Sequence, residues 1–231
     1  MKTIGIVGGL GPESTVEYYK GIIKTIQDTY GNLAYPEIVV YSADVNRLLE
    51  LVEAEEWKKL VEWLVARVRS VHRAGADFAV IGANTAHIVF DEVESCSPIP
   101  MLSIIHETCR RAQSLGLKKP GLMGTLFTMK SDFFQKSFYK KGITVVAPDE
   151  GDQAYIHDKL MSEIELGIIK DSTREGLLSI VKKMIEQESI DSMILGCTEL
   201  PLILDKEEFG IPFLNTTAIH VGSIVEYCLN E

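Results

Sequence analysis

Cysteine is scarce in this sequence, and its spacing suggests neither a metal site nor a disulfide framework. The 231 residues include four cysteines, at positions 96, 109, 197 and 228. They form no C-x-x-C pair, and none has the spacing to a histidine that zinc sites use. We therefore expect no bound metal and free thiols, which are typical of a cytoplasmic protein.

Long apolar runs and an excess of basic residues are also missing. No apolar run approaches the length of a membrane span, and the first residues lack the apolar core and cleavage site of a signal peptide. We therefore expect a cytoplasmic protein without a membrane partner. Because 33 acidic residues outnumber 23 basic ones, giving a net charge of −10, a nucleic-acid partner is not expected. The hydrophobic content of 46% is that of a globular protein with a sizeable core.

One apolar run ends on a cysteine flanked by polar residues. Residues 193–201 read MILGCTELP, so Cys197, Thr198 and Glu199 follow a short buried strand and its glycine. Open α/β sheets bind ligands at the carboxyl ends of their strands. A thiol there would face backbone N–H groups and the positive end of a helix dipole, which both favour the thiolate. The alternative is a buried structural cysteine.

The same pattern occurs earlier in the chain. Residues 78–87 read FAVIGANTAH, again a strand and a glycine, with Ala83 where the later stretch has Cys197. Each stretch follows another glycine-ended apolar run, at 3–9 and at 120–125, after about 75 residues. This spacing predicts two α/β halves built on one plan, with Ala83 and Cys197 in equivalent places.

The order of expected elements gives the lobe boundaries. A strand at 37–42 and a helix at 55–74 complete the first half, and the proline-containing segment 95–100 ends it. Strands at 101–105 and 143–146 and helices at 107–115, 129–138, 155–168 and 174–187 follow. A last strand and helix begin near 211, and we expect this strand to return to the first sheet. The prediction is lobe 1 from 1–97 plus 212–231, and lobe 2 from 98–211.

Glycines after the first strand suggest a binding turn. Gly9, Leu10 and Gly11 precede a helix that starts with proline, and glycine there allows backbone N–H groups to approach a small carboxylate. The turn lacks the third glycine of a dinucleotide fingerprint, which disfavours NAD. After the second strand, Arg47 is either a carboxylate clamp or a surface arginine on a loop.

Further polar side chains follow the other strands. The Asn84 amide and the Thr85 hydroxyl are suited to orienting a carboxylate or an amine. His87 is either a general acid or base or, with better odds, a capping or core histidine. In the second half, the hydroxyls of Thr125 and Thr128 are placed to hold the other end of a substrate.

These stretches together resemble the aspartate/glutamate racemase family. The motifs that carry the resemblance run from the first strand to the last helix: GGLGPEST at 8–15, ANTAH at 83–87, GT at 124–125 with TM at 128–129, GCTELP at 196–201 and TTAIH at 216–220. The resemblance implies an α/β protein of two similar Rossmann-like, flavodoxin-like lobes with parallel sheets, related by a pseudo-two-fold axis, with the active site in the cleft between them. It implies a homodimer that acts on aspartate or glutamate without a cofactor, pyridoxal phosphate included. It also implies one active-site cysteine from each lobe, one removing the α-proton and the other returning a proton from the opposite face.

This sequence departs from the family pattern at the first cysteine position, which holds Ala83. The departure is either natural or a Cys-to-Ala substitution, and in either case alanine cannot transfer a proton. Cys197 is then the acid/base thiol, with Asn84, Thr85 and Thr198 stabilising the enolate-like carboxylate. Two alternatives stay open: a single-cysteine relative, such as a decarboxylase or a maleate isomerase, and a catalytically weakened dicarboxylate-binding paralogue.

Overall fold

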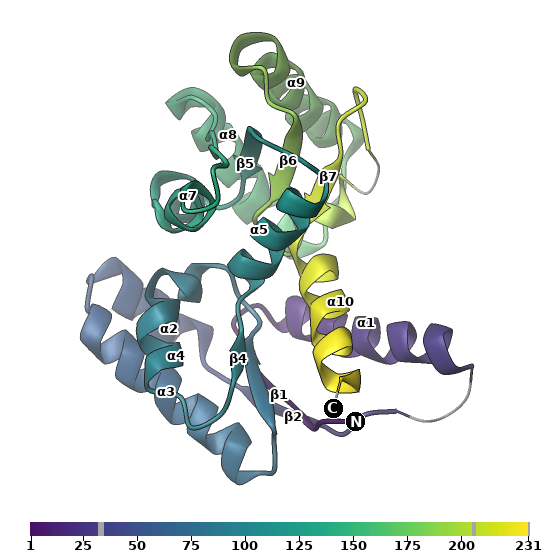
Figure 1. The fold of residues 1–231 in the computed structure, drawn as a ribbon. Helices are drawn as coiled ribbons and strands as arrows, with labels where there is room; N and C mark the ends of the chain where they lie inside the picture. The colour runs from purple at the N-terminus through teal and green to yellow at the C-terminus, as the bar shows by residue number, and fades with distance from the viewer. Residues whose placement is uncertain (32–34, 205–206, 231) are drawn as a thin grey trace. The chain divides into compact units, whose positions relative to one another are not determined.

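The computed structural model describes residues 1–31, 35–204 and 207–230, and the chain forms two compact units. Unit 1 comprises Met1–Glu107 with Thr217–Glu231, and unit 2 comprises Thr108–Thr216. Each unit is a parallel β-sheet with helices packed on it, which is the predicted fold class (Figure 1). The chain therefore leaves unit 1 about ten residues later than the boundary expected after residue 97, and returns to it five residues later than the one expected at 212.

The sheet of unit 1 has four parallel strands in the order β2-β1-β3-β4. Their bounds are β1 Ile4–Gly8, β2 Ile38–Ser42, β3 Phe78–Ile81 and β4 Met101–Leu102. The central pair is in register from Ile4 opposite Phe78 to Val7 opposite Ile81. Both strands of this pair are fully buried, as expected for a parallel sheet covered on two faces.

Helices cover both faces of the first sheet (Figure 1). Because successive strand residues point to opposite faces, Ile4, Ile6, Phe78 and Val80 share one face, where they pack with α1 and α10. On the other face α3 comes so close that a Cβ at Gly5 would lie 2.8 Å from a methyl of Val71. The helices with most or all of their residues in this unit are α1 Pro12–Tyr30, α2 Val45–Glu53, α3 Trp57–Arg73, η1 Thr85–Val89, α4 Phe90–Ser95 and α10 Thr216–Leu229.

Unit 2 holds a three-stranded parallel sheet in the order β5-β6-β7. Its strands are β5 Pro120–Met123, β6 Ser192–Leu195 and β7 Phe213–Asn215. Apolar side chains of α8 and α9 pack with Met123, Met193 and Leu195 in one core cluster. The helices are α5 Ile104–Ser114, which begins in unit 1, α6 Leu126–Lys130, α7 Phe133–Tyr139, α8 Glu150–Ser162, η2 Ile164–Leu166, α9 Asp171–Glu188 and η3 Leu200–Leu202.

The two units share one plan around their central strands. In unit 1 the backbone N–H of Gly82, just after β3, donates to the carbonyl of Val7 on β1 at 2.9 Å. In unit 2 the N–H of Gly196, just after β6, donates to the carbonyl of Met123 on β5 at 2.7 Å. Each glycine is followed by the residue of interest, Ala83 or Cys197. These two residues therefore occupy equivalent places, each in its own unit.

The prediction for the last strand is wrong. We expected the strand near residue 211 to join the first sheet, but β7 pairs with β6, from Met193 opposite Phe213 to Leu195 opposite Asn215. The physical reason is that β6 would otherwise leave the backbone groups on its side away from β5 unpaired. In unit 1, β4 pairs with β3 in the same way. The expected strand at 143–146 contributes only a bridge from Gly121 to Val146. The helix after β7 does return to unit 1.

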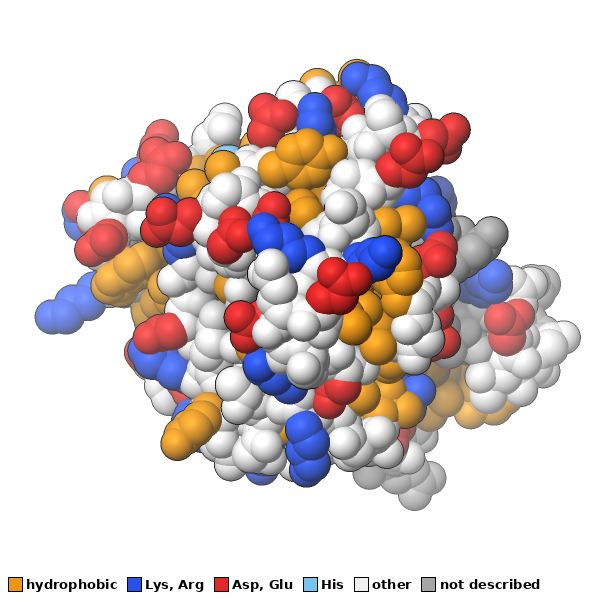
Figure 2. Space-filling view, turned by 90° about the horizontal axis from the view of Figure 1, so that it is seen from above, with side chains coloured by type: hydrophobic (Ala, Val, Ile, Leu, Met, Phe, Trp, Pro, Cys, Tyr) orange, Lys and Arg blue, Asp and Glu red, His pale blue; other side chains and the backbone are white. Residues whose placement is uncertain are grey.

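Several element boundaries also differ from the predictions. The expected strand at 101–105 stops at Leu102, since α5 already begins at Ile104, and β4 pairs with β3 in the first sheet. The expected helix at 129–138 is two short helices, α6 and α7. Among the described residues, no helix is both long and apolar enough to span a membrane. Acidic and basic side chains are interspersed on the face shown in Figure 2.

Candidate active site

Cys197 lies two residues beyond the end of β6, at the carboxyl edge of the unit 2 sheet. It is buried and belongs to the apolar cluster that also contains Leu195 and Leu200. A Cβ on the preceding Gly196 would lie 2.9 Å from the carbonyl oxygen of Met123, so glycine lets the chain pass close to β5 before the cysteine. The strand end thus holds the thiol in a fixed, largely dry position.

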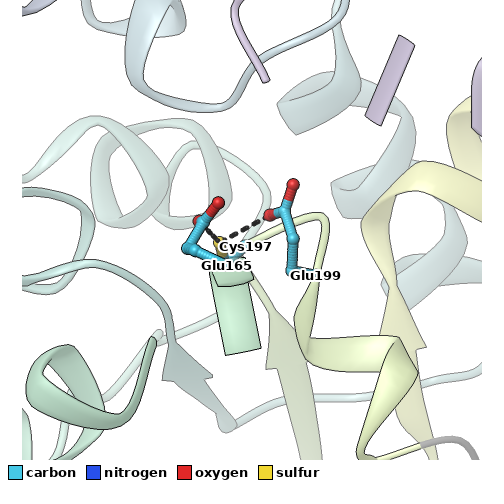
Figure 3. Close-up of side chains that lie close together, drawn as sticks. All are labelled: Glu165, Cys197 and Glu199. Atoms are coloured by element: carbon cyan, nitrogen blue, oxygen red, sulfur yellow. Dashed lines mark hydrogen bonds between the residues drawn. The ribbon is translucent and has the colours of Figure 1, made fainter. Parts of the chain in front are cut away.

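Two carboxyl groups flank the sulfur (Figure 3). The Cys197 thiol donates to Glu199 Oε2, with an Sγ to oxygen distance of 3.0 Å, and Glu165 Oε1 lies 3.4 Å from Sγ. The Thr198 hydroxyl also donates to Glu199 Oε2, at 2.6 Å. The site is therefore a thiol between two acids, one of which is fixed by a neighbouring hydroxyl.

These surroundings correct the expectation of a helix dipole that favours the thiolate. In the described segment directly after Cys197, the helix is the three-residue 3₁₀ helix η3, which is too short for a strong dipole. Burial, and then the nearby charges of Glu199 and Glu165, raise the pKa of the Cys197 thiol well above its usual value. The resting group is a neutral thiol, and a thiolate must be made by passing the proton to a neighbour.

Glu165 was not identified from the sequence. The segment 155–168 was expected to be one helix, whereas α8 ends at Ser162 and the 3₁₀ helix η2 follows, which brings Glu165 to Cys197. The signal that was available is Gly167, which takes a left-handed conformation with a φ of 72° directly after η2. A glycine near a predicted helix end indicates an earlier stop.

The predicted hydroxyls Thr125 and Thr128 do form one turn after β5. Thr125 caps α6 by accepting the N–H of Thr128 at 3.3 Å, and the two hydroxyl oxygens are 3.1 Å apart. Thr128 is buried and Thr125 is half-buried. The N–H of Leu126 donates to Nδ1 of His157 on α8, at 3.4 Å, so this histidine supports the turn.

In unit 1, the position equivalent to Cys197 has no ionisable side chain. Ala83 is buried, and its carbonyl accepts a hydrogen bond from Nδ1 of His87 at 2.7 Å, while His87 Nε2 accepts the N–H of Ile104 at 3.4 Å. Burial lowers the pKa of His87 to about 4, so the ring is neutral at pH 7. This is the core histidine that was favoured from the sequence. Asn84 is buried beside it, and Thr85 starts η1.

A second buried histidine lies in the same unit. His220 Nδ1 accepts the hydroxyl of Tyr18 at 2.7 Å, and its Nε2 donates to the carbonyl of Leu102 at 3.1 Å. Burial lowers the pKa of His220 to about 3 and raises the pKa of Tyr18. Both groups are thus neutral and paired, and they join α1, α10 and the β4 strand.

The glycine turn and Arg47 both have partners within unit 1. The N–H of Gly9 donates to the Thr15 hydroxyl at 2.8 Å, so it is already engaged within the turn. Gly9 has a φ of 76°, and a Cβ there would lie 2.5 Å from the carbonyl oxygen of Ala43. Leu10 is buried, and Gly11 caps α1. Arg47 lies on α2, not on a loop, and pairs with Glu50 at 2.8 Å on the surface.

Glu165, Cys197 and Glu199 are also the residues that have the geometry of metal ligands. Within the described part of the chain, their ligand atoms lie within 4.8 Å of one another. The hydrogen bonds among the thiol, the carboxyl groups and the Thr198 hydroxyl already account for this proximity.

Comparison with known proteins identifies the relatives of this chain. A family model described as Asp/Glu/Hydantoin racemase matches residues 7–224. The broad specificity amino-acid racemase RacX of Bacillus subtilis (strain 168) is 28% identical over 226 residues, which cover 96% of each protein. The crystal structure of an aspartate racemase homologue from Pyrococcus horikoshii OT3 superposes with a TM-score of 0.89, at 33% identity and 100% coverage of both chains. Glutamate racemase from Aquifex pyrophilus shares the fold, with a TM-score of 0.65 and 20% identity over 97% of this chain and 83% of that one.

Proposed function

Because the chain belongs to the Asp/Glu/hydantoin racemase family, we propose that it is a cofactor-independent racemase of aspartate or glutamate that uses Cys197 as its acid/base thiol. The proposal includes a cytoplasmic homodimer. Its relatives by name include an amino-acid racemase of broad specificity and an aspartate racemase homologue, which supports an amino acid as substrate. The acidic side chain of that amino acid is the finer part of the proposal.

The chemistry demands a strong base next to a preorganised polar site. The α-proton of an amino acid is weakly acidic, and without a cofactor the developing negative charge must be held by the enzyme's own hydrogen-bond donors. Thr198, Thr125 and Thr128 supply hydroxyls in unit 2, and Asn84 and Thr85 supply an amide and a hydroxyl in unit 1. In this proposal these groups hold the substrate carboxylates, with the backbone turn at 9–11 and Arg47 as further candidates.

The observation that carries the proposal is the hydrogen bond from the Cys197 thiol to Glu199, at 3.0 Å. A thiol with a raised pKa is a weak base in its neutral form, but a carboxylate at this distance can accept its proton. The thiolate so formed is a competent base for a carbon acid. A cysteine that served only for packing would not need a carboxyl group fixed beside its sulfur.

Ala83 limits the reaction in this proposal. It stands at the place in unit 1 that corresponds to Cys197, and we assign it as the position of the missing second cysteine. With one thiol, exchange of the α-proton is favoured for one enantiomer, and full racemisation needs a second proton carrier. The same observation favours a second candidate function, a dicarboxylate-binding protein that has lost turnover.

Proton exchange separates these two functions. The protein is incubated in deuterated water with each of L-aspartate, D-aspartate, L-glutamate and D-glutamate, and loss of the α-proton is followed by NMR. A racemase with Cys197 as its base exchanges at least one enantiomer, and the Cys197→Ala variant does not. Binding of the same ligands without any exchange supports the binding protein. Exchange that is unchanged in Cys197→Ala contradicts the role of this thiol.

A further inference from the structure

A histidine on α8 contacts the turn that carries the two threonine hydroxyls of unit 2. The backbone N–H of Leu126, the first residue of α6, donates to Nδ1 of His157 at 3.4 Å. The first N–H groups of a helix have no acceptor within the helix itself. Here a side chain from another helix accepts one of them. His157 therefore ties the start of α6 to α8.

This contact also fixes the tautomer of the His157 ring. A ring nitrogen accepts an N–H only when it carries no proton, so Nδ1 is the unprotonated nitrogen and the proton of the neutral ring is on Nε2. A side chain with an acceptor in the place of Nδ1 can therefore replace the histidine in this role. Asparagine has such an acceptor, because its Oδ1 is bonded to Cγ as Nδ1 is, whereas leucine has a methyl group there.

The turn held by His157 lies directly beside the strand end that carries Cys197. A Cβ on Gly196, the residue before the cysteine, would lie 3.3 Å from the methyl group of Thr128. On α8, Ile156 precedes His157 and belongs to the apolar cluster that also contains Cys197. A shift of the turn relative to α8 would therefore move its hydroxyls relative to the thiol.

One of the two hydroxyls in the turn has a proton to spare. The hydroxyl oxygens of Thr125 and Thr128 are 3.1 Å apart, so one O–H donates to the other oxygen. Thr128 is 1% exposed, whereas Thr125 is half-buried, so the Thr125 O–H is the one that a substrate can reach. The next residue along the chain is Leu126, whose N–H is held by His157.

We propose that His157 is a positioning residue for substrate binding, which holds the start of α6 so that the Thr125 hydroxyl is placed to donate to a substrate carboxylate. This role rests on the proposed function, in which Thr125 and Thr128 hold a carboxylate, and extends it to a residue on another helix. The contact of His157 is with the backbone of the turn, so the histidine acts through the turn. Its loss should weaken binding and leave proton transfer at Cys197 nearly unchanged.

The experiment measures binding and turnover separately. The dissociation constants of both enantiomers of aspartate and glutamate are measured by calorimetry, and α-proton exchange by NMR, in the wild type, His157→Leu and His157→Asn. Because the Leu126 N–H loses its acceptor, we expect His157→Leu to raise the dissociation constant and KM about tenfold, with the exchange rate at saturation within about twofold of the wild type. His157→Asn should recover most of the binding. Asp158→Asn, an exposed change on the same helix, is the matched control and should bind as the wild type does.

Amide hydrogen exchange of Leu126 tests the contact itself and needs no substrate. The Leu126 N–H should exchange with solvent faster in His157→Leu than in the wild type and in His157→Asn. If its protection is equal in all three proteins, His157 does not hold the turn, whatever the other assays show. If protection is lost in His157→Leu but the dissociation constants are unchanged, the histidine supports the fold alone, and the inference is wrong.

Failure of the proposed function gives a different result. If the amino acids bind and their binding depends on His157 as expected, but no α-proton exchanges, the positioning role stands and the racemase function fails. If His157→Asn binds as weakly as His157→Leu, the acceptor is not what matters, and the inference is wrong. A lower exchange rate at saturation with unchanged dissociation constants also contradicts it, since His157 would then act on the chemistry. A wild type that binds none of the four amino acids contradicts both proposals.

Discussion

The ends of the central strands β3 and β6 follow the same plan but carry opposite chemistry. Both are followed by a glycine whose N–H donates to a carbonyl of the neighbouring strand, and then by a buried residue. After β6 that residue is Cys197, with Glu199 and Glu165 at its sulfur. After β3 it is Ala83, whose methyl has no proton to give, and whose carbonyl is held by the neutral ring of His87.

This difference teaches which parts of the fold are scaffold and which are chemistry. The glycine and its hydrogen bond recur in both units, so they serve the turn that ends a central strand. The two acidic groups occur at the end of β6, and the buried His87 occurs at the end of β3. Burial keeps the histidines neutral, whereas in unit 2 it raises the pKa of a thiol and of a carboxyl group. Burial thus keeps the histidine rings of unit 1 uncharged, and it favours the protonated forms of the thiol and the carboxyl group in unit 2.

Replacing the sulfur should have the largest effect, because it removes the thiol that distinguishes the end of β6 from the end of β3. In Cys197→Ser the hydroxyl is a far weaker acid than a thiol, and we expect the α-proton exchange rate to fall about a thousandfold. The rate is measured by NMR in deuterated water. Cys96→Ser, which changes an exposed cysteine, is the control and should keep the wild-type rate. A fall of similar size in both variants would mean that the loss of exchange is not specific to the sulfur of Cys197.

Removing the charge of Glu199, the carboxylate that accepts the thiol proton, should have the second largest effect. Glu199→Gln leaves the thiol without a carboxylate to take its proton, and we expect the exchange rate to fall about a hundredfold. Glu199→Asp keeps the carboxylate and should recover part of the rate, which a purely structural role would not predict. Rates are compared over a range of pH, with folding checked by circular dichroism. A Glu199→Gln variant with wild-type exchange would remove Glu199 from the mechanism.

The buried histidines of unit 1 should make stability depend on pH. The pKa values of His87 and His220 are lowered to about 4 and about 3 in the folded state, so the unfolded chain binds protons first as the pH falls below about 6.5. Stability from each histidine is complete above that pH and is lost at about 1.4 kcal/mol per pH unit below it. Urea unfolding at pH 7, 6 and 5 measures the loss. Ring resonances that titrate near pH 6.5 in the folded protein would contradict it.

The smallest expected effect concerns the hydrogen bond that holds His220. Tyr18→Phe removes the hydroxyl and leaves Nδ1 of the buried ring without its donor, so we expect a loss of about 1 kcal/mol in the free energy of unfolding. Tyr19→Phe, on an exposed side chain of the same helix, is the matched control and should change stability by less than about 0.5 kcal/mol. Equal urea midpoints for the two variants would show that the Tyr18 hydroxyl does not contribute.

The sequence predicted the repeated features and missed the ones that depend on unrepeated contacts. Apolar runs ending in glycine predicted both central strands and the equivalence of positions 83 and 197. Such a run indicates a buried strand by its own residues, without information from distant parts of the chain. Two kinds of feature were not predicted. The pairing of β7 with β6 depends on which sheet has an unpaired strand edge. The approach of Glu165 to the sulfur depends on the end of α8 at Ser162, which lies 35 residues before Cys197 in the chain. Local sequence says little about either.

The most direct test of the account is to install in unit 1 the group that unit 2 already has. Exchange of the α-proton is measured for both enantiomers of aspartate and of glutamate in the wild type, Ala83→Cys and Ala83→Ser. We predict that the wild type exchanges one enantiomer much faster than the other, that Ala83→Cys raises exchange of the slower one, and that Ala83→Ser does not. Equal exchange of both enantiomers by the wild type, or a bias that Ala83→Cys leaves unchanged, would contradict the proposal that Ala83 stands where a second acid/base cysteine is missing.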